Sequence, residues 1–333
     1  SQCRAAGEKR PALMLIIAWE VTAACNLSCG YCRASASRKP DPAELSTEEA
    51  ISFLDSIAPL RPMLILSGGE PLLRPDIFLL ARHAKSLGLR VSLASNGTTI
   101  TSQAADEIAA SGISRVSISL DAASSTGHDR MRGQGSFERA MQGIENLRGK
   151  VDFQINHTIT GRNESDVASI FDLAERVGAV ALHFFFLVAT GRGREEDLLT
   201  PERQEERLME IDQVRERHAI DVQVTCAPQY ARIARPGKRR AGGCLAGRSF
   251  VFVSRTGDVY PCGYFPLKVG SIREKNFIEI WENAPELLAL RERALTGKCG
   301  RCSYAGTCGG CRARAYAESG DFLGPDPSCR LET

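Results

Sequence analysis

The sequence predicts an α/β fold: a partial (β/α)6 TIM-like barrel followed by a small cysteine-rich C-terminal domain. Two observations lead to this prediction. From Leu13 to Ile159, short apolar runs alternate with amphipathic segments, which is the pattern of repeated βα units around a parallel sheet. From Gly243 onward the chain is rich in Gly, Cys and Arg and poor in apolar residues, which is typical of a small domain stabilised by metal.

Six strands are predicted, each a short apolar run. They span Leu15 to Thr22, Met63 to Ser67, Arg90 to Ser95, Ser114 to Leu120, Asp152 to Thr158 and Ala181 to Val188. Helices are predicted where apolar residues have helical spacing, and several follow an N-capping Ser, Thr, Asp or Asn. They span Thr47 to Ile57, Asp76 to Leu87, Thr101 to Ser111, Ser136 to Arg148, Glu164 to Val177, Glu202 to Arg217 and Phe277 to Arg293. Right-handed crossovers put the helices outside the sheet, so functional residues are expected at the C-terminal strand ends.

A linker is predicted between the barrel and the C-terminal domain. Residues 234–243 are rich in Arg, Lys, Gly and Pro, a composition that favours loops. We therefore expect an N-terminal extension at 1–12, a barrel with its following helix and linker at 13–239, and a cysteine-rich domain at 240–333.

Charge and hydropathy give no indication of a nucleic-acid partner or of a membrane. The net charge is +2, from 42 basic and 40 acidic residues, so nothing favours nucleic acid or an anionic membrane surface. The longest apolar stretch, Ala179 to Ala189, is too short to cross a bilayer, which takes about 20 apolar residues. No small-residue cleavage site follows the first apolar run. We expect a soluble cytoplasmic protein, with a monomer as the default.

The cysteines are grouped along the chain. Of twelve, three lie at 25–32 and eight at 226–329, while none occurs between Arg33 and Thr225 and only Cys3 stands apart. In a reducing compartment, grouped cysteines are metal or cluster ligands more often than disulfides. The spacing therefore predicts two regions of metal ligation.

The first group forms a loop directly after the first predicted strand. Cys25, Cys29 and Cys32 put three thiolates at the rim where function is expected. Thiolates are soft ligands that suit iron–sulfur clusters or zinc. Three of them leave one iron of a four-iron cluster open to a small molecule. A structural zinc site is the alternative, and it requires a fourth ligand.

This loop resembles the signature of the radical S-adenosylmethionine (SAM) superfamily. The cysteine spacing, with aromatic Tyr31 before the last cysteine, is similar to that signature, and segments after the next three strands are similar to the family's SAM-binding segments. The resemblance assigns the SAM amino group to Gly68, Gly69 and Glu70, the ribose to Ser95 and Asn96, and the carboxylate to the region of Ser119, Arg130 and Arg132, with Tyr31 and Leu187 as further SAM contacts. Because each segment follows a predicted strand, the segments support one another.

The resemblance implies radical chemistry. An electron enters a [4Fe-4S] cluster held by Cys25, Cys29 and Cys32 and passes to SAM, whose C–S bond breaks to give methionine and a 5′-deoxyadenosyl radical. That radical abstracts hydrogen from the substrate, so the site must exclude water. A flavodoxin or a ferredoxin is expected as the electron donor.

A hairpin is predicted between two cysteines of the second group. The apolar run Phe250 to Val253 is followed by the turn Thr256-Gly257-Asp258, which is typical of a β-hairpin. Such a hairpin would bring Cys244 and Cys262 together.

The second group resembles the SPASM extension, which carries auxiliary clusters. The family pattern implies one [4Fe-4S] cluster on Cys299, Cys302, Cys308 and Cys329. It assigns Cys244, Cys262 and Cys311 to a second cluster, which is one ligand short, and Cys226 is our candidate for that ligand. The family usually has three residues before the cysteine at 311, and here there are two, Gly309 and Gly310. One or two auxiliary clusters are thus expected, and a zinc ribbon is the alternative.

Further segments resemble the anaerobic haem synthase family AhbD. They are Trp19-Glu20-Val21-Thr22, Cys32-Arg33-Ala34, 187–193, 261–264 and 311–316. This family acts on iron coproporphyrin III, so the resemblance implies a tetrapyrrole substrate and two oxidative decarboxylations, which convert two propionates to the vinyl groups of haem b. After hydrogen abstraction from the propionate β-carbon, a vinyl group forms with loss of carbon dioxide only if one more electron departs, and an auxiliary cluster is suited to receive it.

Substrate contacts and competing functions complete the prediction. Arg192 and Arg194 are candidate clamps for the substrate carboxylates, and solvated surface arginines are the alternative. His157 and His183 are candidate ligands of the substrate iron, although a strand histidine is more often a core residue. A related enzyme acting on another tetrapyrrole or a peptide, and a zinc or iron–sulfur binding protein without turnover, are the competing functions. The roughly ten residues before the first strand disfavour a peptide leader-binding domain.

Overall fold

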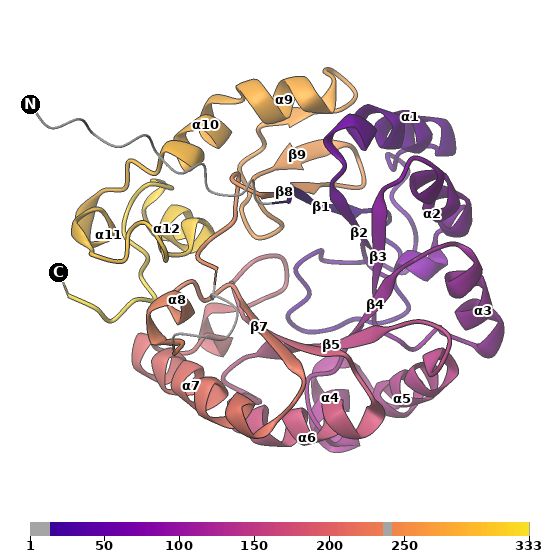
Figure 1. The fold of residues 1–333 in the computed structure, drawn as a ribbon, viewed down its shortest axis with the longest axis horizontal. Helices are drawn as coiled ribbons and strands as arrows, with labels where there is room; N and C mark the ends of the chain where they lie inside the picture. Colours follow the sequence, from indigo (N-terminus) through magenta and orange to yellow (C-terminus); the bar gives the residue numbers. More distant parts are fainter. Residues whose placement is uncertain (1–13, 236–241, 333) are drawn as a thin grey trace, which may run out of the picture.

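Parallel strands form the centre of the protein. In the computed structural model, which describes residues 14–235 and 242–332, they curve into an open barrel with the helices outside it (Figure 1). The strand order is β10-β9-β8-β1-β2-β3-β4-β5-β6-β7, and neighbouring strands from β8 to β7 are parallel. The predicted α/β partial barrel is confirmed. The predicted extension 1–12, Cys3 and the boundary at 239 lie outside the described residues.

The strands agree with the six predicted ones and add others. Their bounds are β1 Ile16–Glu20, β2 Met63–Ser67, β3 Arg90–Ser95, β4 Arg115–Ser119, β5 Phe153–Ile159, β6 Ala181–Phe186, β7 Asp221–Thr225, β8 Phe250–Val253, β9 Asp258–Tyr260 and β10 Gly270–Ser271. The predicted hairpin is formed by β8 and β9, which are antiparallel. Strand β8 also pairs with β1, so the C-terminal segment extends the barrel sheet. Neither β7 nor this pairing was predicted.

Most helices lie along the outer face of the sheet, whereas α11 and α12 lie in the C-terminal part of the chain (Figure 1). Their bounds are α1 Thr47–Ile57, α2 Ile77–Ser86, α3 Ser102–Ala110, α4 Ser125–Arg132, α5 Ser136–Leu147, α6 Val167–Val177, α7 Pro201–Val214, α8 Tyr230–Ile233, α9 Phe277–Asn283, α10 Pro285–Glu292, α11 Gly297–Arg301 and α12 Arg312–Ser319. The single helix predicted at 277–293 is wrong, because Pro285 begins a second helix after an extended Ala284. Within 14–235 and 242–332, no helix has the length and apolar character needed to cross a membrane.

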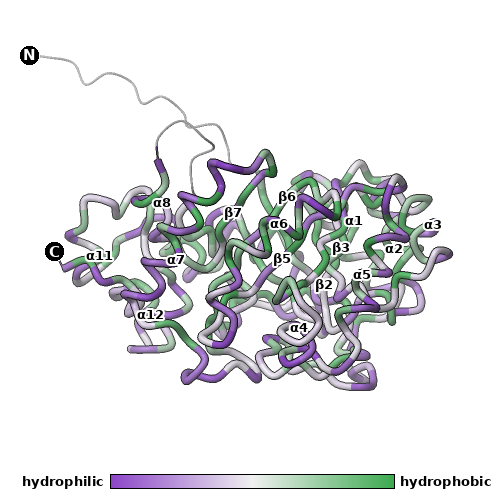
Figure 2. Tube along the Cα trace, turned by 90° about the horizontal axis from the view of Figure 1, so that it is seen from below, coloured by the Kyte–Doolittle hydropathy of each residue, from purple (hydrophilic) through white to green (hydrophobic). Residues whose placement is uncertain are grey.

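The core lies between the sheet and the helices. Trp19 of β1 packs edge-on against Phe53 of α1, with ring centroids 5.4 Å apart, and Phe184 of β6 packs against Phe171 of α6 at 5.3 Å. Figure 2 shows hydrophobic segments concentrated at the central strands and hydrophilic segments toward the periphery. Along β2, and in β5 from Ile155 and in β6 from Leu182 onward, buried residues alternate with half-buried ones. The half-buried set forms the inner face of the barrel, since strand side chains alternate between the two faces.

Candidate functional site

The three N-terminal cysteines lie on the loop after β1, at the C-terminal end of the sheet. Cys25 is buried, whereas Cys29 and Cys32 are half-buried. The Sγ of Cys25 accepts hydrogen bonds from the N–H of Leu27 at 3.4 Å and from the side-chain amide of Asn96 at 3.8 Å. Burial raises the pKa of Cys25 and of Cys29, and charge on the neighbouring thiols raises both further. The three thiols are therefore within electrostatic reach of one another.

These thiols suit an iron–sulfur cluster. None of the eleven cysteines that the structure describes is in a disulfide, so their thiols are available as ligands. The described residues include no group of three or more His, Cys, Asp or Glu side chains that could hold a single metal ion. In a cluster each thiolate binds a different iron. A loop with three free thiols at the strand ends fits that donor set.

Gly69 brings the end of β2 against the cysteine loop. Its N–H donates to the carbonyl of Thr22 at 2.8 Å, and the N–H of Glu70 donates to the carbonyl of Ala24 at 2.7 Å. A Cβ at position 69 would lie 2.3 Å from the carbonyl oxygen of Ala24. Only glycine allows this close approach of the two segments.

Glu70 connects the ends of β2 and β3. Its fully buried carboxylate accepts hydrogen bonds from the hydroxyl of Ser95 and the N–H of Asn96, both at 2.8 Å. Burial raises the pKa of Glu70 to about 7, and the hydrogen bonds oppose that rise. The residues predicted to bind the amino group and the ribose of SAM are thus brought together, and the Glu70 carboxylate holds Ser95 and Asn96 in position.

Asp121, which follows β4, holds Tyr31 of the cysteine loop. The phenol of Tyr31 and the guanidinium of Arg132 both donate to its carboxylate, and Arg132 also donates to the phenolic oxygen. The second carboxylate oxygen accepts from the N–H of Thr158 at 3.2 Å. Burial by itself would raise the pKa of Asp121, but the charge of Arg132 holds it below its usual value. A buried ion pair therefore fixes the aromatic residue of the signature.

The other residues predicted to contact SAM differ in position. Ser119 is the half-buried last residue of β4. Arg130 is exposed and donates to the carbonyl of Arg162 at 2.8 Å, whereas Arg132 has only 10% of its side chain exposed. Leu187 is buried just after β6. Of the two arginines of α4, only Arg132 contacts the cysteine loop.

Arg192 fastens the loop after β6 onto the cysteine loop. Its N–H donates to the carbonyl of Cys32 at 3.0 Å and its Nε donates to the carbonyl of Cys29 at 2.9 Å. Its Nη2 is buried and has no hydrogen-bond partner among the described residues. Arg194 is exposed and pairs with Glu196 at 3.1 Å. Binding of the substrate carboxylates by Arg192 and Arg194 stays a prediction. The hydrogen bonds of Arg192 show that it supports the cysteine loop.

The two strand histidines face opposite sides of the sheet. His157 is fully buried, with Nδ1 3.0 Å from the carbonyl of Leu120 and its ring 5.7 Å from that of Phe184, which packs against the helix layer. His183 is half-buried on the inner face, with Nδ1 3.1 Å from the side-chain nitrogen of Gln154. The orientation of His157 therefore does not support the prediction that it contacts substrate.

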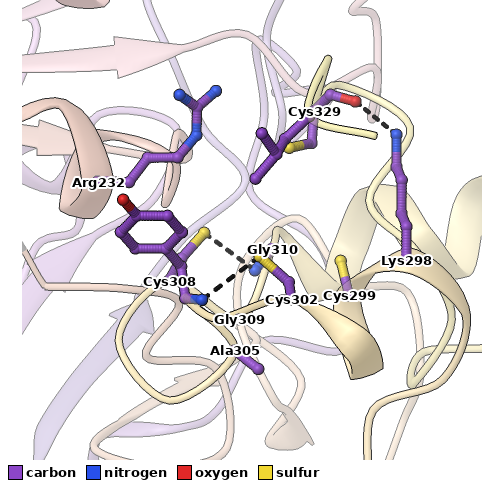
Figure 3. A pocket seen from close by; sticks show the side chains of 11 residues that line it. Arg232, Lys298, Cys299, Cys302, Ala305, Cys308, Gly309, Gly310 and Cys329 are labelled. Atoms are coloured by element: carbon purple, nitrogen blue, oxygen red, sulfur yellow. Dashed lines mark hydrogen bonds between the residues drawn. The ribbon is translucent and has the colours of Figure 1, made fainter. Parts of the chain in front are cut away.

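Four cysteines of the C-terminal domain line one cavity (Figure 3). They are Cys299, Cys302, Cys308 and Cys329. The N–H of Gly310 donates to the Sγ of Cys308 at 3.4 Å, and the side chains of Arg232 and Lys298 also line the cavity. Hydrogen-bond donors and cations stabilise thiolates. This is the set that the SPASM resemblance assigns to one cluster, and its thiols fit such a group.

The remaining four cysteines of this region also lie close together. They are Cys226, Cys244, Cys262 and Cys311. Burial raises the pKa of Cys226, Cys262 and Cys311, and charge on other members of the set raises each further. Cys226 has a φ of 62°, a conformation that residues with a Cβ rarely adopt and that is often kept at functional sites. The structure therefore brings Cys226 to the three cysteines that lacked a fourth ligand.

Gly310 accounts for the short spacing between Cys308 and Cys311. Its φ is 60°, and a Cβ there would lie 2.8 Å from the Cβ of Asp326 and 3.1 Å from the Sγ of Cys299. The buried carboxylate of Asp326 accepts from the N–H of Cys311 at 2.6 Å, and its own N–H donates to the Sγ of Cys299 at 3.4 Å. One turn and one carboxylate thus join the two cysteine sets.

Two buried charged residues, Arg314 and Asp326, were not predicted as site residues, and a third, Asp121, was predicted only as part of the region of Ser119 that the resemblance assigns to the SAM carboxylate. Arg314 of α12 donates to the carbonyl of Cys226 and, at 2.7 Å, to that of Leu187. It therefore connects the second cysteine set to the end of β6. The sequence signal was weak, because Asp121 and Arg314 lie within segments recognised by resemblance, 119–121 and 311–316, with no separate role assigned to them, and Asp326 lies three residues before Cys329.

Comparison with known proteins identifies the family. The radical SAM superfamily matches residues 19–174, and the iron–sulfur cluster-binding domain SPASM matches residues 244–303. Over 334 residues the chain is 46% identical to an AdoMet-dependent heme synthase from Methanosarcina barkeri, covering 94% of this chain and 95% of that protein. The chain belongs to the radical SAM heme synthase family.

A further relative agrees with this family, and a solved structure agrees with the fold. An AdoMet-dependent heme synthase from Nitratidesulfovibrio vulgaris is 42% identical over 335 residues, which cover 94% of this chain and 91% of that protein. The crystal structure of Streptococcus suis SuiB bound to S-adenosylmethionine has the same fold, with a TM-score of 0.78, 18% identity, and coverage of 96% of this chain and 78% of that chain. As a radical SAM heme synthase family member, the chain uses a [4Fe-4S] cluster with SAM, and its SPASM domain implies auxiliary clusters.

A Gly69→Ala variant of this family member is expected to be destabilised by about 1–3 kcal/mol, because its Cβ would press on backbone carbonyls that cannot rotate away. Thermal unfolding followed by circular dichroism measures this. The matched control is Gly161→Ala, whose Cβ would have no atom nearer than 3.7 Å. A Gly69→Ala melting temperature equal to that of the control would contradict the close approach of the two segments.

Proposed function

We propose that this protein is a haem synthase, which converts iron coproporphyrin III to haem b by oxidative decarboxylation of two propionates. The observation that carries the proposal is the sequence similarity of this chain to proteins named AdoMet-dependent heme synthase. The two relatives are 46% and 42% identical to it over nearly its whole length. The three loop thiols and the predicted SAM-binding segments at one edge of the sheet support it.

In this proposal the cysteine loop and the strand ends hold the reactive group. Cys25, Cys29 and Cys32 hold the [4Fe-4S] cluster, and the SAM contacts are Tyr31, Gly68, Gly69, Glu70, Ser95, Asn96, Ser119, Arg130, Arg132 and Leu187. When bound, the reduced cluster and SAM supply a carbon radical that abstracts a hydrogen atom. The protein's own contribution is positional, since Glu70 orients Ser95 and Asn96, and Asp121 orients Tyr31 and Arg132.

The C-terminal cysteines are proposed to serve the oxidative half of the reaction. Each propionate loses one hydrogen atom, one carbon dioxide and one further electron as it becomes a vinyl group. We assign Cys299, Cys302, Cys308 and Cys329 to one electron-accepting cluster and Cys226, Cys244, Cys262 and Cys311 to another. Arg314 supports the second assignment, because its hydrogen bonds join Cys226 to the end of β6.

Further parts of the proposal concern organisation. We propose that the barrel unit ends at 239 and the auxiliary-cluster domain begins at 240. We also propose that the protein acts as a cytoplasmic monomer and receives electrons from a flavodoxin or a ferredoxin. A reducing donor is required because SAM cleavage consumes an electron for each propionate.

An anaerobic turnover assay tests the proposed function. The reconstituted protein is incubated with SAM, a strong reductant and iron coproporphyrin III, and the products are read by mass spectrometry. We expect loss of two carboxyl groups, with one 5′-deoxyadenosine formed for each. Formation of 5′-deoxyadenosine with an unchanged porphyrin would reject this substrate while leaving the family assignment intact.

The role of Cys226 gives a separate prediction. A Cys226→Ala variant is expected to lose about four irons per chain if its set holds a complete four-iron cluster, because a thiolate ligand is removed from a buried site. Iron and sulfide determination on the reconstituted protein measures the loss. Cys308→Ala, in the other set, is expected to lose a similar amount. Iron content equal to wild type in Cys226→Ala would reject Cys226 as a ligand.

A further inference from the structure

Polar residues stand on the inner face of β5 and β6. Along these strands Ile155, His157 and Phe184 are buried toward the helices, while Asn156 and His183 are half-buried on the opposite face. The β5–β6 register pairs Asn156 with His183. These two side chains are therefore neighbours on the face turned away from the helices of residues 14–235 and 242–332, where a substrate inside the barrel would meet them.

Asn156 and His183 both accept a hydrogen bond from the side chain of Gln154. The side-chain nitrogen of Gln154 lies 2.9 Å from the Oδ1 of Asn156 and 3.1 Å from the Nδ1 of His183. With the amide orientations in the structure, Gln154 donates to both atoms, so Nδ1 of His183 accepts and Nε2 carries the proton. Burial lowers the pKa of His183 to about 4, which keeps the ring neutral at neutral pH. The pair therefore presents two N–H donors, Nε2 of His183 and Nδ2 of Asn156.

A cation stands on the same face. Arg115 is the first residue of β4 and shares a face with Ser117 and Ser119, since Val116 and Ile118 are buried in the core on the other side. No hydrogen bond or ion pair of the Arg115 side chain is found among the described residues.

Charges reach His183 from two other strands. The positive charge of Arg115 lowers the pKa of His183, and the negative charge of Asp221 on β7 raises it, so both groups lie within electrostatic reach of the imidazole. Arg115 is thus the cation whose charge acts on the His183 imidazole.

The position of this group relative to the SAM segments suits a large substrate. Ser119, a predicted SAM contact, pairs with Asn156, which pairs with His183 in the same row of the sheet. His183 is therefore about 10 Å across the sheet from Ser119, and Arg115 is roughly 13 Å down the strand from it. A porphyrin with four carboxylate arms spans distances of this order, so one arm can lie near SAM while another reaches the group.

We propose that Arg115, Asn156 and His183 form a carboxylate-binding site that anchors a propionate other than the one that reacts. Arginine binds a carboxylate through two parallel N–H bonds, and the neutral imidazole and the amide add one donor each. The inference rests on the proposed function, because it takes its ligand from the proposed substrate. It adds the residues that hold that substrate, none of which belongs to the cysteine loop or the SAM segments.

Equilibrium binding of metal-free coproporphyrin III and of iron coproporphyrin III to the reconstituted protein tests this site. Arg115→Gln and His183→Ala are each expected to weaken both porphyrins at least tenfold. Arg115→Lys is expected to recover part of the affinity, because it keeps the charge and loses the bidentate geometry. The tetramethyl ester of coproporphyrin III is expected to bind wild type and variants equally weakly. The matched controls are Arg82→Gln and His83→Gln on the outer surface of α2.

Each outcome of this experiment has one meaning. Wild-type affinity in folded Arg115→Gln and His183→Ala would overturn the carboxylate site. It would leave the proposed function intact, because the turnover assay tests that function separately. A loss in His183→Ala that is confined to the iron porphyrin, with a shifted Soret band, would overturn carboxylate binding in favour of iron ligation by His183. Failure of wild type to bind either porphyrin would reject the proposed function itself. If a variant unfolds, as judged by circular dichroism, the ester comparison in wild type and Arg115→Lys decides the same question.

Discussion

A Cys29→Ala variant is expected to form no detectable 5′-deoxyadenosine from SAM, while keeping the iron bound by the C-terminal cysteines. The loop offers three thiols for a cluster, and the chain has no cysteine between Arg33 and Thr225 that could replace a lost ligand. The C-terminal sets lie in and beside other elements, namely β7, the hairpin of β8 and β9, and the helices α11 and α12, so they do not depend on this loop. Iron content and SAM cleavage with a strong reductant, measured on the same reconstituted sample, check both halves of the prediction.

Cys3→Ala is the matched control for this loss, because Cys3 belongs to neither cysteine group. It is expected to retain wild-type iron content and SAM cleavage. If Cys29→Ala still cleaved SAM at the wild-type rate, the loop would not be the site of the cluster. If it lost all iron, the two regions would not be independent sites.

Most of the barrel was predictable because its signals are local. Period-two and period-3.6 patterns identify strands and helices within a few residues of their ends, and capping groups such as Ser46, which accepts from the N–H of Glu49, mark helix starts. β7 was missed although its sequence, Asp-Val-Gln-Val-Thr, alternates polar and apolar residues, because a run of only five residues gives a short signal. The pairing of β8 with β1 joins segments more than two hundred residues apart, and no local pattern reports such a contact.

The same distinction between local signals and long-range contacts applies to the residues of the site. Cysteine spacing predicted the loop thiols, because thiolates are the ligands that iron–sulfur clusters need. The SAM segments were assigned by their resemblance to the radical SAM superfamily. The direction of a side chain depends on strand register, so the sequence did not distinguish His157, which faces the helices, from His183, which faces the interior. Supporting residues are harder still. Asp326 accepts from the N–H of Cys311, 15 residues away, and Asp121 accepts from the phenol of Tyr31, 90 residues away, and only the fold brings these partners together.

Asp121→Asn is expected to destabilise the reconstituted protein by about 3–5 kcal/mol, because it leaves the guanidinium of Arg132 buried without a counter-charge. The aspartate has no exposed surface, and asparagine replaces one of its two acceptor oxygens with an NH2 donor. The side chain can then no longer accept from both Tyr31 and the N–H of Thr158 through separate oxygens, so the cysteine loop should loosen. Thermal unfolding by circular dichroism gives the stability. The control is Asp106→Asn, whose partner Lys150 is on the surface and whose ion pair should contribute no more than about 1 kcal/mol.

A double variant separates the ion pair from simple loss of packing. If the pair is the cause, Asp121→Asn combined with Arg132→Gln should cost less than the sum of the two single changes, since the second change removes the charge that the first left unpaired. Additive losses would mean that each side chain acts through packing alone. A stability of Asp121→Asn equal to that of Asp106→Asn would mean that the buried pair does not hold the signature loop, and Tyr31 would then need another anchor.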